Sequence, residues 1–286
     1  MVSLVTPDSR IRLEMIRKAR EQELEARKRL ARIKHKVAVM SGKGGVGKSF
    51  VAASLAVTLA AMGKTVGILD ADFHGPSIPK LLGVKGKRML SGPPGLLPVT
   101  GPLGVKVVSI DFLLPSEESP VIWRGPLKAG ALRELLSMVV WGDLDYLIVD
   151  LPPGTGDEPL SVAQLVNDLS GAVIVTIPSD LSRVIVKKAV AFAQQLNLRV
   201  LGIVENMSYF VCPKCGSTYR IFGEGAGRRI AEEMGVDFLG EIPLDPRVAK
   251  CSDEGKPFVL CYPDSEVSIA LRKIVEAVVS KVEGAG

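Results

Sequence analysis

The chain is poor in histidine, cysteine and aromatic residues and has no long apolar run, and these absences exclude several classes of protein. Its 286 residues include only two histidines, four cysteines and 5% aromatic residues. Four cysteines in a chain of this length do not make the disulfide framework on which small secreted domains depend. No apolar run reaches the length of a membrane span and no secretory signal opens the chain, so we expect a cytoplasmic protein.

Most of the chain also lacks an excess of charge of either sign. The formal net charge is +5, yet the first 36 residues alone hold eleven Lys and Arg against five Asp and Glu. Of the 36 basic and 31 acidic residues in the whole chain, this leaves 25 and 26 for the remainder, which is nearly neutral. The basicity therefore belongs to an N-terminal arm. The body, in a chain that is 47% hydrophobic, can bury the core of one α/β domain.

The basic arm has the composition of a helix. Residues 10–36 are rich in Arg, Lys, Glu, Leu and Ala, and Glu14 with Lys18 forms an i,i+4 pair of the favourable order. The apolar positions make only a thin stripe, which indicates a solvated helix packed loosely on the body. A nucleic-acid-binding or membrane-surface arm is the alternative, disfavoured because no aromatic residue interleaves the basic ones. We therefore divide the chain into a helical extension, residues 1–35, and a single domain, residues 36–286.

A glycine-rich loop is the strongest motif in the chain. The apolar run 37–40 leads into it and a helical pattern follows it, which is the context that a phosphate-binding loop requires. The glycines let backbone amides surround a phosphate, and the helix start adds the positive end of its dipole. We expect Lys48 to bridge the β- and γ-phosphates and Ser49 to hold Mg²⁺ through its hydroxyl. The predicted nucleotide-binding residues here are Gly42, Lys43, Gly44, Gly45, Val46, Gly47, Lys48, Ser49 and Phe50.

Lys43 is a second lysine inside this loop. Because the loop backbone already surrounds its own nucleotide, the Lys43 side chain is better placed to reach a nucleotide in a facing subunit. The run from Gly42 to Ser49 resembles the deviant Walker A sequence of the MinD/ParA/nitrogenase-iron-protein class. In that class this lysine crosses a dimer interface to the partner's ATP. The resemblance thus implies a nucleotide-bridged homodimer in which Lys43 and Lys48 are both catalytic.

Carboxylates follow two buried strands. One apolar run ends at Asp70 and Asp72, and another ends at Asp150 in the Walker B arrangement. The carboxyl ends of strands in open α/β sheets face the ligand crevice. By resemblance to the class, Asp72 would orient or deprotonate the attacking water and Asp70 would support the metal, while Asp150 would hold Mg²⁺ through water or Ser49. Capping of a turn is the alternative for Asp70 and Asp72.

Further candidates lie in loops and at helix starts. Residues 151–157 combine prolines with glycines, which suits a loop that shifts when the γ-phosphate leaves, although a plain turn would have the same composition. Asn206 stands where the class places an asparagine that reads adenine, with a turn asparagine as the alternative. Lys128 is left open between a phosphate contact, a partner contact and a solvated surface position.

The order of apolar runs predicts the fold class. Strand patterns near residues 105–110, 171–176 and 200–204 alternate with helical ones such as 182–196. Alternating βα units indicate a mainly parallel twisted sheet with helices on both faces, as in P-loop NTPases. Residues 83–104 are dense in Gly and Pro and predict a surface loop or hairpin. The last helical pattern, residues 265–282, is interpreted as a core-packing helix because it lacks the Phe, Trp and basic face of a membrane-binding one.

Cys212 and Cys215 form a C-x-x-C pair in a loop without a helix signal. They offer two of the four ligands that a tetrahedral zinc or a four-iron cluster requires, and a symmetric dimer would supply the full set. A zinc site shared across the dimer and a pair of inert cysteines are the alternatives. We expect Cys251 and Cys261 to be buried packing residues and assign them no chemistry.

Several motifs together resemble the Mrp/ApbC (Nbp/Ind-type) family of iron–sulfur cluster carrier ATPases. The resemblance covers roughly Lys34 to the C-terminus and implies ATP, Mg²⁺ and slow ATP hydrolysis. It also implies a [4Fe–4S] cluster bridged by Cys212 and Cys215 of two subunits and passed to apo-proteins. The matching segments are Asp145 to Ser161, Asp70-Ala71-Asp72 with Gly75-Pro76-Ser77, and Glu205-Asn206-Met207-Ser208 followed by the two cysteines.

Two departures from that family leave the choice of partner open. The small N-terminal domain of many bacterial members is absent, as is the cysteine-rich N-terminal segment of the eukaryotic cytosolic members. The alternative function is a MinD- or ParA-like positioning ATPase acting on membrane or DNA, with a structural zinc at the C-x-x-C pair. Cys212 and Cys215 discriminate between the two, because a positioning ATPase has no use for a cluster site.

Overall fold

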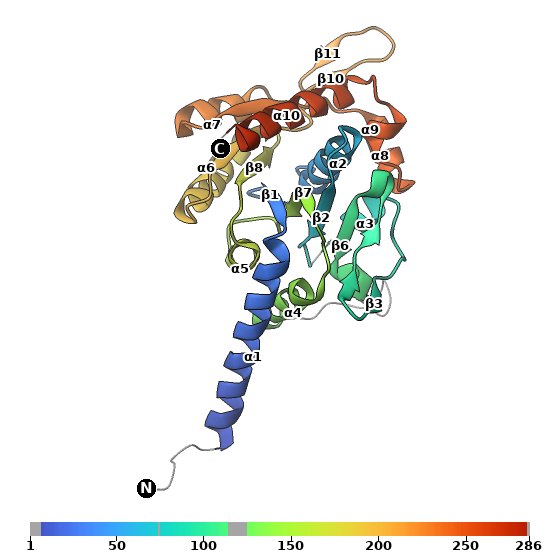
Figure 1. The fold of residues 1–286 in the computed structure, drawn as a ribbon. Helices are drawn as coiled ribbons and strands as arrows, with labels where there is room; N and C mark the ends of the chain where they lie inside the picture. The colour runs from blue at the N-terminus through green and yellow to red at the C-terminus, as the bar shows by residue number, and fades with distance from the viewer. Residues whose placement is uncertain (1–6, 74, 114–124, 285–286) are drawn as a thin grey trace.

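The computed structural model describes residues 7–73, 75–113 and 125–284, and its centre is a twisted sheet with helices on both faces (Figure 1). The strand order is β12-β9-β8-β1-β7-β2-β6-β5, and every pairing is parallel except that of β5 with β6. The predicted mainly parallel α/β fold is therefore confirmed. The strands of this sheet are β1 (Ile33–Met40), β2 (Val66–Asp70), β5 (Val99–Thr100), β6 (Lys106–Ser109), β7 (Leu144–Asp150), β8 (Gly171–Thr176), β9 (Val200–Glu205) and β12 (Phe238–Glu241).

The helices and two small hairpins complete the described part of the chain. The helices are α1 (Pro7–Leu30), α2 (Lys48–Ala61), α3 (Ile78–Leu81), α4 (Gly125–Met138), α5 (Asp157–Val166), α6 (Asp180–Gln195), α7 (Ala226–Met234), α8 (Pro246–Asp253), α9 (Phe258–Cys261) and α10 (Glu266–Glu283), with 3₁₀ turns at Pro102–Gly104 and Ile110–Leu113. The hairpins are β3 (Leu90–Gly92) with β4 (Gly95–Leu97), and β10 (Phe210–Val211) with β11 (Thr218–Tyr219).

Apolar side chains on both faces of the central strands explain their uninterrupted hydrophobic sequences. In β1, Val37 and Val39 lie in the core beneath α2 and α10, whereas Ala38 and Met40 lie in the core beneath α4 and α5. A parallel sheet with both faces covered needs such continuous apolar runs rather than alternation. The final helix, α10, buries Val267, Leu271, Ile274, Val275 and Val278, which confirms the prediction of a core-packing helix.

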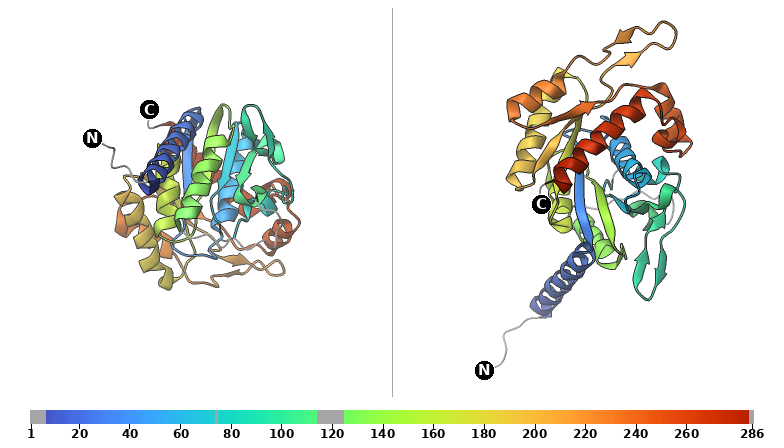
Figure 2. Two further views of the ribbon diagram at one scale, coloured as in Figure 1. Left: turned by 90° about the horizontal axis from the view of Figure 1, so that it is seen from below. Right: turned by 45° about the horizontal axis from the view of Figure 1, so that its top comes forward.

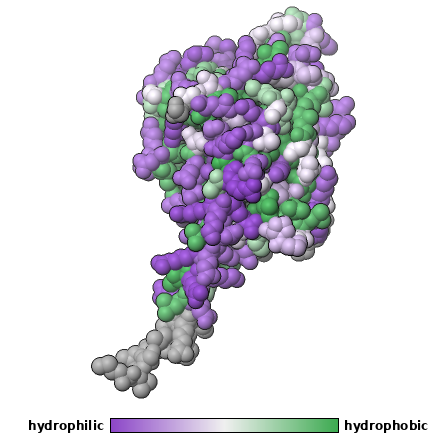
Figure 3. Space-filling model, viewed as in Figure 1, coloured by the Kyte–Doolittle hydropathy of each residue, from purple (hydrophilic) through white to green (hydrophobic). Residues whose placement is uncertain are grey.

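The N-terminal helix ends earlier in the sequence, and packs more closely on the body, than the sequence predicts. The predicted helix runs to Lys36, but α1 ends at Leu30 and β1 begins at Ile33, because pairing with β7 overrides the helix propensity of the Lys and Arg residues. Ala26 and Leu30 are fully buried against α4 and α5. The first half of α1 stands away from the body (Figures 1 and 2), and the exposed apolar side chains of Leu13, Met15 and Ile16 lie among its basic and acidic ones (Figure 3). Within the described residues, no helix has the length and apolar character to cross a bilayer.

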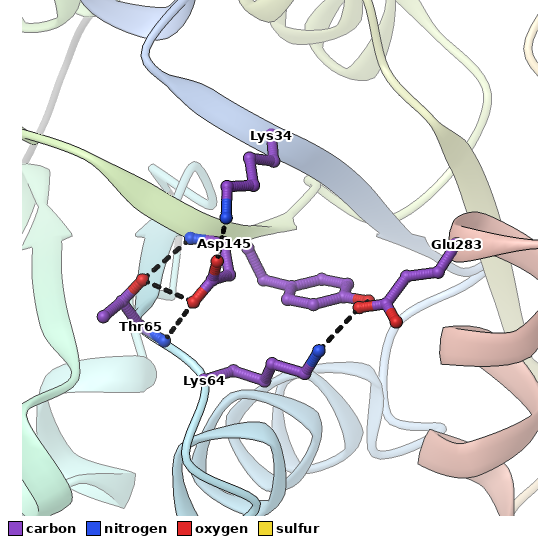
Figure 4. A network of polar contacts seen from close by, with 6 residues as sticks. Lys34, Lys64, Thr65, Asp145 and Glu283 are labelled. Atoms are coloured by element: carbon purple, nitrogen blue, oxygen red, sulfur yellow. Dashed lines mark hydrogen bonds and ion pairs between the residues drawn. The ribbon is translucent and has the colours of Figure 1, made fainter. Parts of the chain in front are cut away.

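A polar network ties the strands together at the edge of the sheet opposite the glycine-rich loop (Figure 4). The Asp145 carboxylate accepts hydrogen bonds from the Lys34 amine at 2.7 Å and from the amide and hydroxyl of Thr65 at 2.8 and 2.7 Å. These donors, Lys34 first, hold the pKa of Asp145 far below its usual range. The Tyr146 hydroxyl donates to Glu283 of α10 at 2.7 Å. The network therefore joins β1, β7, the start of β2 and the C-terminal helix.

Candidate functional site: a phosphate-binding loop and a cysteine hairpin

The glycine-rich loop joins the end of β1 to the start of α2. Gly45 and Gly47 have φ angles of 77° and 81°, in the left-handed region that favours glycine. A Cβ on Gly47 would lie 2.2 Å from the Asn206 amide nitrogen, so no other residue fits there. The loop thus has the strand–loop–helix setting that exposes backbone amides and a helix N-terminus to a phosphate.

Lys48 and Asp150, which the sequence assigns to phosphate and magnesium, lie against each other. The Lys48 amine is 2.5 Å from one carboxylate oxygen of Asp150, and their side chains are 6% and 0% exposed. The second carboxylate oxygen of Asp150 is buried and has no hydrogen-bond partner among the described residues. Burial raises the pKa of Asp150, and the Lys48 charge opposes that shift. An unpartnered anionic oxygen in a buried site is suited to a cation or to its water shell.

Asp70 lies beside Asp150, because the two residues are register partners on β2 and β7. The pKa of Asp70 is raised well above its ordinary value, first by burial and then by the negative charge of Asp150. Two adjacent buried carboxylates and the Ser49 hydroxyl, 3.3 Å from the Lys48 amine, form an all-oxygen donor set. Such donors fit Mg²⁺, which prefers a few carboxylates and retains waters.

Asp70 also fixes the backbone of the segment that carries Asp72. Its two carboxylate oxygens accept hydrogen bonds from the Asp72 amide and the Ile78 amide, each at 3.2 Å, and the Ser109 hydroxyl approaches at 3.3 Å. Asp72 is half-buried, and its carboxylate accepts from the Gly75 amide at 3.3 Å. The structure therefore brings Asp70, Asp72 and Asp150 to the same edge of the sheet, next to Lys48.

The loop after β7 is held to the phosphate loop at one point and borders a cavity on its other side. The Gly154 amide donates to the Ser41 carbonyl at 2.9 Å. A cavity of about 250 Å³ lies between α4 and α5, and Pro152 of this loop lines it together with Phe73 and Leu132. Lys128, also in the lining, is 5% exposed and pairs with Glu158 at 2.6 Å. Lys128 therefore lies in a buried ion pair rather than on a solvated surface.

Asn206 contacts the phosphate loop directly. Its side-chain amide donates to the Val46 carbonyl at 2.9 Å, and the residue is only 3% exposed. Its backbone amide donates to Thr176 of β8 at 2.7 Å. The end of β9 is thereby joined to the phosphate loop, a contact that the sequence did not indicate. The adenine contact assigned to Asn206 from the sequence stays a prediction.

Glu205, which the sequence analysis gave no role of its own, organises the chain immediately after β9. Its buried carboxylate accepts from the Ser208 hydroxyl at 2.6 Å and from the Gly227 amide, in the first turn of α7, at 2.5 Å. The Ser208 amide in turn donates to Ile242 at 2.9 Å. The root of the following hairpin is thus fixed to the body. The signal in the sequence was a carboxylate ending an apolar strand, as for Asp70 and Asp150.

The two cysteines sit at the tip of the β10–β11 hairpin, which projects from the body (Figures 1 and 2). The tip is a tight turn in which the Cys212 amide donates to Ser217 and the Gly216 amide donates to Cys212, both at 2.9 Å. Cys215 is exposed and Cys212 half-buried. The Ser217 hydroxyl, 3.3 Å from the Cys215 sulfur, leads the groups that lower the pKa of Cys215, and a thiol with a lowered pKa is a better metal ligand.

The described residues of one chain provide no third ligand near the cysteine pair. Nowhere in residues 7–73, 75–113 and 125–284 do three or more His, Cys, Asp or Glu side chains come together in a way that could hold a metal ion. Of the two other cysteines, Cys251 is buried, as the sequence predicts, but Cys261 is exposed because it ends a helix of a single turn. Two thiols at C-x-x-C spacing, on an exposed hairpin, are half of the ligand set of a tetrahedral zinc or a four-iron cluster.

Comparison with protein families and curated proteins gives concordant matches. Residues 32–279 match the family model described as "ParA: NUBPL iron-transfer P-loop NTPase". An iron–sulfur cluster carrier protein of Saccharolobus solfataricus is 54% identical over 272 residues, covering 94% of this chain and 92% of that protein. A protein of the same name from Methanocaldococcus jannaschii is 51% identical over 264 residues, covering 92% and 90%.

Solved structures show the same relationship. A nucleotide-binding protein from Archaeoglobus fulgidus, in complex with ADP, is 49% identical and has a TM-score of 0.74, covering 82% of this chain and 92% of that one. The septum site-determining protein MinD of Pyrococcus horikoshii, with Mg-ADP, has a TM-score of 0.64 at 22% identity, covering 86% and 96%. The likeness to MinD concerns the fold alone.

Proposed function

The chain belongs to the NUBPL iron-transfer P-loop NTPase family, and on that premise we propose that it is an ATP-hydrolysing carrier of iron–sulfur clusters. The cargo is a [4Fe–4S] cluster bound by Cys212 and Cys215 from each of two subunits and passed to apo-proteins. The carrier works in the cytoplasm, where thiols are kept reduced. Relatives at 45–54% identity are named as cluster carriers, which supports this function over that of a positioning ATPase.

One observation carries the proposal: a short, fixed segment connects the nucleotide loop to the exposed thiol pair. Asn206 is bonded to the phosphate loop, Glu205 and Ser208 fix the next turn, and the chain then runs directly into the hairpin that holds Cys212. A change in the loop on nucleotide hydrolysis therefore has a direct mechanical route to the cysteine pair. A positioning ATPase would need neither the thiols nor this route.

The dimer is part of the proposal because both candidate sites are incomplete in one chain. The cysteine pair offers two ligands to a cargo that takes four. Lys43 lies in the phosphate loop with part of its side chain exposed. The resemblance of this loop to the deviant Walker A sequence implies that Lys43 reaches the nucleotide of a facing subunit. We propose that one two-fold axis relates both the two nucleotide sites and the two hairpins, so that one symmetry operation completes both sites.

The chemistry of hydrolysis is assigned to residues at the carboxyl edge of the sheet. The loop amides and Lys48 bind and orient the β- and γ-phosphates, and Lys43 of the facing subunit neutralises charge that develops during transfer. Asp72 orients the attacking water or accepts its proton. Asp150, Asp70 and Ser49 would hold Mg²⁺, which would supply positive charge to offset that of the phosphates. Loss of the γ-phosphate frees the loop after β7 to move toward its cavity, and the hairpins then release the cargo.

Anaerobic reconstitution with iron and sulfide tests the proposal. The unmodified chain is compared with Cys212→Ala/Cys215→Ala, and Cys251→Ala/Cys261→Ala serves as a matched control that removes the same number of thiols elsewhere. We expect visible absorption and about four iron and four sulfide per dimer in the unmodified chain and the control, but none in the hairpin variant. Transfer to an apo-protein is measured with and without ATP, as the loss of visible absorption from the carrier and its appearance in the separated acceptor.

The outcomes separate the alternatives. A product that holds only zinc, without visible absorption, would support a structural zinc at the hairpin and contradict the carrier function. A cluster bound by a monomer, or retained in the hairpin variant, would contradict the bridged site.

A further inference from the structure

Ser41 is a buried residue between β1 and the glycine-rich loop that has no part in the proposed chemistry. It directly follows Met40, the last residue of β1, and is 1% exposed. Its hydroxyl donates to the Lys43 carbonyl at 2.9 Å, and its own carbonyl accepts from the Gly154 amide at 2.9 Å. Ser41 therefore joins the end of the strand to the backbone of Lys43 and to the loop after β7.

The bond from the Ser41 hydroxyl fixes the plane of the peptide between Lys43 and Gly44. This peptide is trans and planar, so its carbonyl and its N–H point in opposite directions. Because the Lys43 carbonyl is turned toward Ser41, the Gly44 amide is turned away from it. One of the two peptide planes that flank the Lys43 α-carbon is therefore set by Ser41.

The chain on the other side of Lys43 is restrained at Gly42. A Cβ added to Gly42 would lie 2.7 Å from the carbonyl oxygen of Ile185, which is closer than a side chain can approach backbone without displacing it. The chain therefore passes directly against α6 at this glycine. Because Lys43 follows immediately, its backbone is held from both sides, by the contact with α6 and by the Ser41 hydroxyl.

The surroundings of the loop beyond Lys43 are open. A Cβ added to Gly44 would meet no atom of the described residues within 4 Å, and the same holds for Gly45. Lys43 itself is partly exposed. A lysine whose backbone is already fixed has only its side chain left to order when it reaches away from its own loop, so the entropy cost of that reach is small.

We propose that Ser41 is the positioning residue of Lys43, and that its hydroxyl sets the direction in which the Lys43 side chain reaches the nucleotide of the facing subunit. This role rests on the nucleotide-bridged dimer of the proposed function. Ser41 acts through Lys43 and is assigned no contact of its own with the transferred phosphate. Because its carbonyl also accepts from the Gly154 amide, a shift of the loop after β7 would reach Lys43 through this one residue.

The substitution Ser41→Ala removes the hydroxyl and little else, and phosphate release over a range of ATP concentrations measures its effect. We expect kcat to fall by roughly 5–20-fold and KM for ATP to stay within about threefold, because Lys43 loses the hydrogen bond that places it. Ser137→Ala is the matched control and should leave both constants unchanged. Ser137 is also buried, and its hydroxyl also donates to a backbone carbonyl, that of Glu134 at 2.7 Å, but near the end of α4.

The double variant Ser41→Ala/Lys43→Ala separates positioning of Lys43 from general damage to the loop. We expect it to hydrolyse ATP within about twofold of the rate of Lys43→Ala alone, because residues that act through one another are not additive. A loss from Ser41→Ala that is as large without Lys43 as with it overturns the proposal, and so does an unmodified kcat in Ser41→Ala; both results leave the dimer standing. An unmodified rate in Lys43→Ala would instead contradict the nucleotide-bridged dimer and, with it, the role of Ser41, so the two failures are distinguishable.

Discussion

At the scale of single residues, the site is defined by buried charge. Lys48 and Asp150 are paired at 2.5 Å, and Asp70 adds a second buried carboxylate beside them. Removing one partner of a buried pair leaves an uncompensated charge, which costs about 3–5 kcal/mol. A loss of activity in a variant of Lys48 or Asp150 could therefore come from lost stability rather than from lost chemistry. Lys43, which is partly exposed, is the better residue with which to test the chemistry.

The substitution Lys43→Ala is expected to abolish ATP-dependent dimerisation and to slow hydrolysis at least about 100-fold, because a cation supplied in trans to the transferred phosphoryl group is worth about 10³–10⁵ in rate. Binding of ATP by the monomer should change by no more than about threefold. Light scattering with a non-hydrolysable analogue and phosphate release measure the two effects. Lys87→Ala, an exposed lysine in another loop, is the control. Hydrolysis by Lys43→Ala at the unmodified rate would remove the argument for a nucleotide-bridged dimer.

At the scale of elements, sequence patterns predict what depends on neighbours in the chain. The glycine spacing and the apolar runs around it located the phosphate loop, β2, β7 and the carboxylates that end them. The contacts missed were between residues far apart in sequence: Asn206 with Val46, and Lys128 with Glu158. No periodicity records such pairs, because each depends on how separate elements pack. The same limit explains the start of β1 at Ile33, where pairing with β7 decides the conformation.

The link between β9 and the cysteine hairpin can be tested at Glu205. The two carboxylate oxygens of Glu205 accept one hydrogen bond each, from the Ser208 hydroxyl and the Gly227 amide. The Gln side chain in Glu205→Gln has only one acceptor oxygen, so one of these buried hydrogen bonds is lost. We expect the free energy of unfolding to fall by about 1–3 kcal/mol and the bound cluster to be lost faster. Denaturant unfolding and the decay of visible absorption measure these effects. Glu232→Gln, an exposed position on α7, should change neither, and equal behaviour of the two variants would exclude an anchoring role for Glu205.

At the scale of the whole molecule, the two edges of the sheet are specialised. The carboxyl edge holds the predicted nucleotide-binding residues and leads into the β10–β11 hairpin, and the proposed cluster transfer requires movement there. The opposite edge is closed by the Asp145 network, which joins strands near both ends of the chain (Figure 4). Helix α1 leads into that closed edge, and its second half packs into the core while its first half projects from the body (Figure 1).

The closed edge should make the whole fold sensitive to acid through Asp145. Because the pKa of Asp145 is lowered in the folded chain, its stabilisation is complete above the unfolded value of about 3.9 and is lost as the pH falls below it. At pH 7 we expect the free energy of unfolding of Asp145→Asn to be about 1–2 kcal/mol lower than that of the unmodified chain, because Lys34 and Thr65 lose a charged acceptor. The difference should shrink as the pH is lowered from 4 toward 2.

Denaturant unfolding at a series of pH values measures that difference. Asp143→Asn is the matched control, because Asp143 pairs with Arg32 from a side chain that is 80% exposed. Such exposed pairs contribute little to stability, so the control should unfold almost as the unmodified chain does at every pH. A gap for Asp145→Asn that stays constant from pH 7 to pH 2 would mean that side-chain shape, and not the charge of the carboxylate, holds this edge of the sheet together.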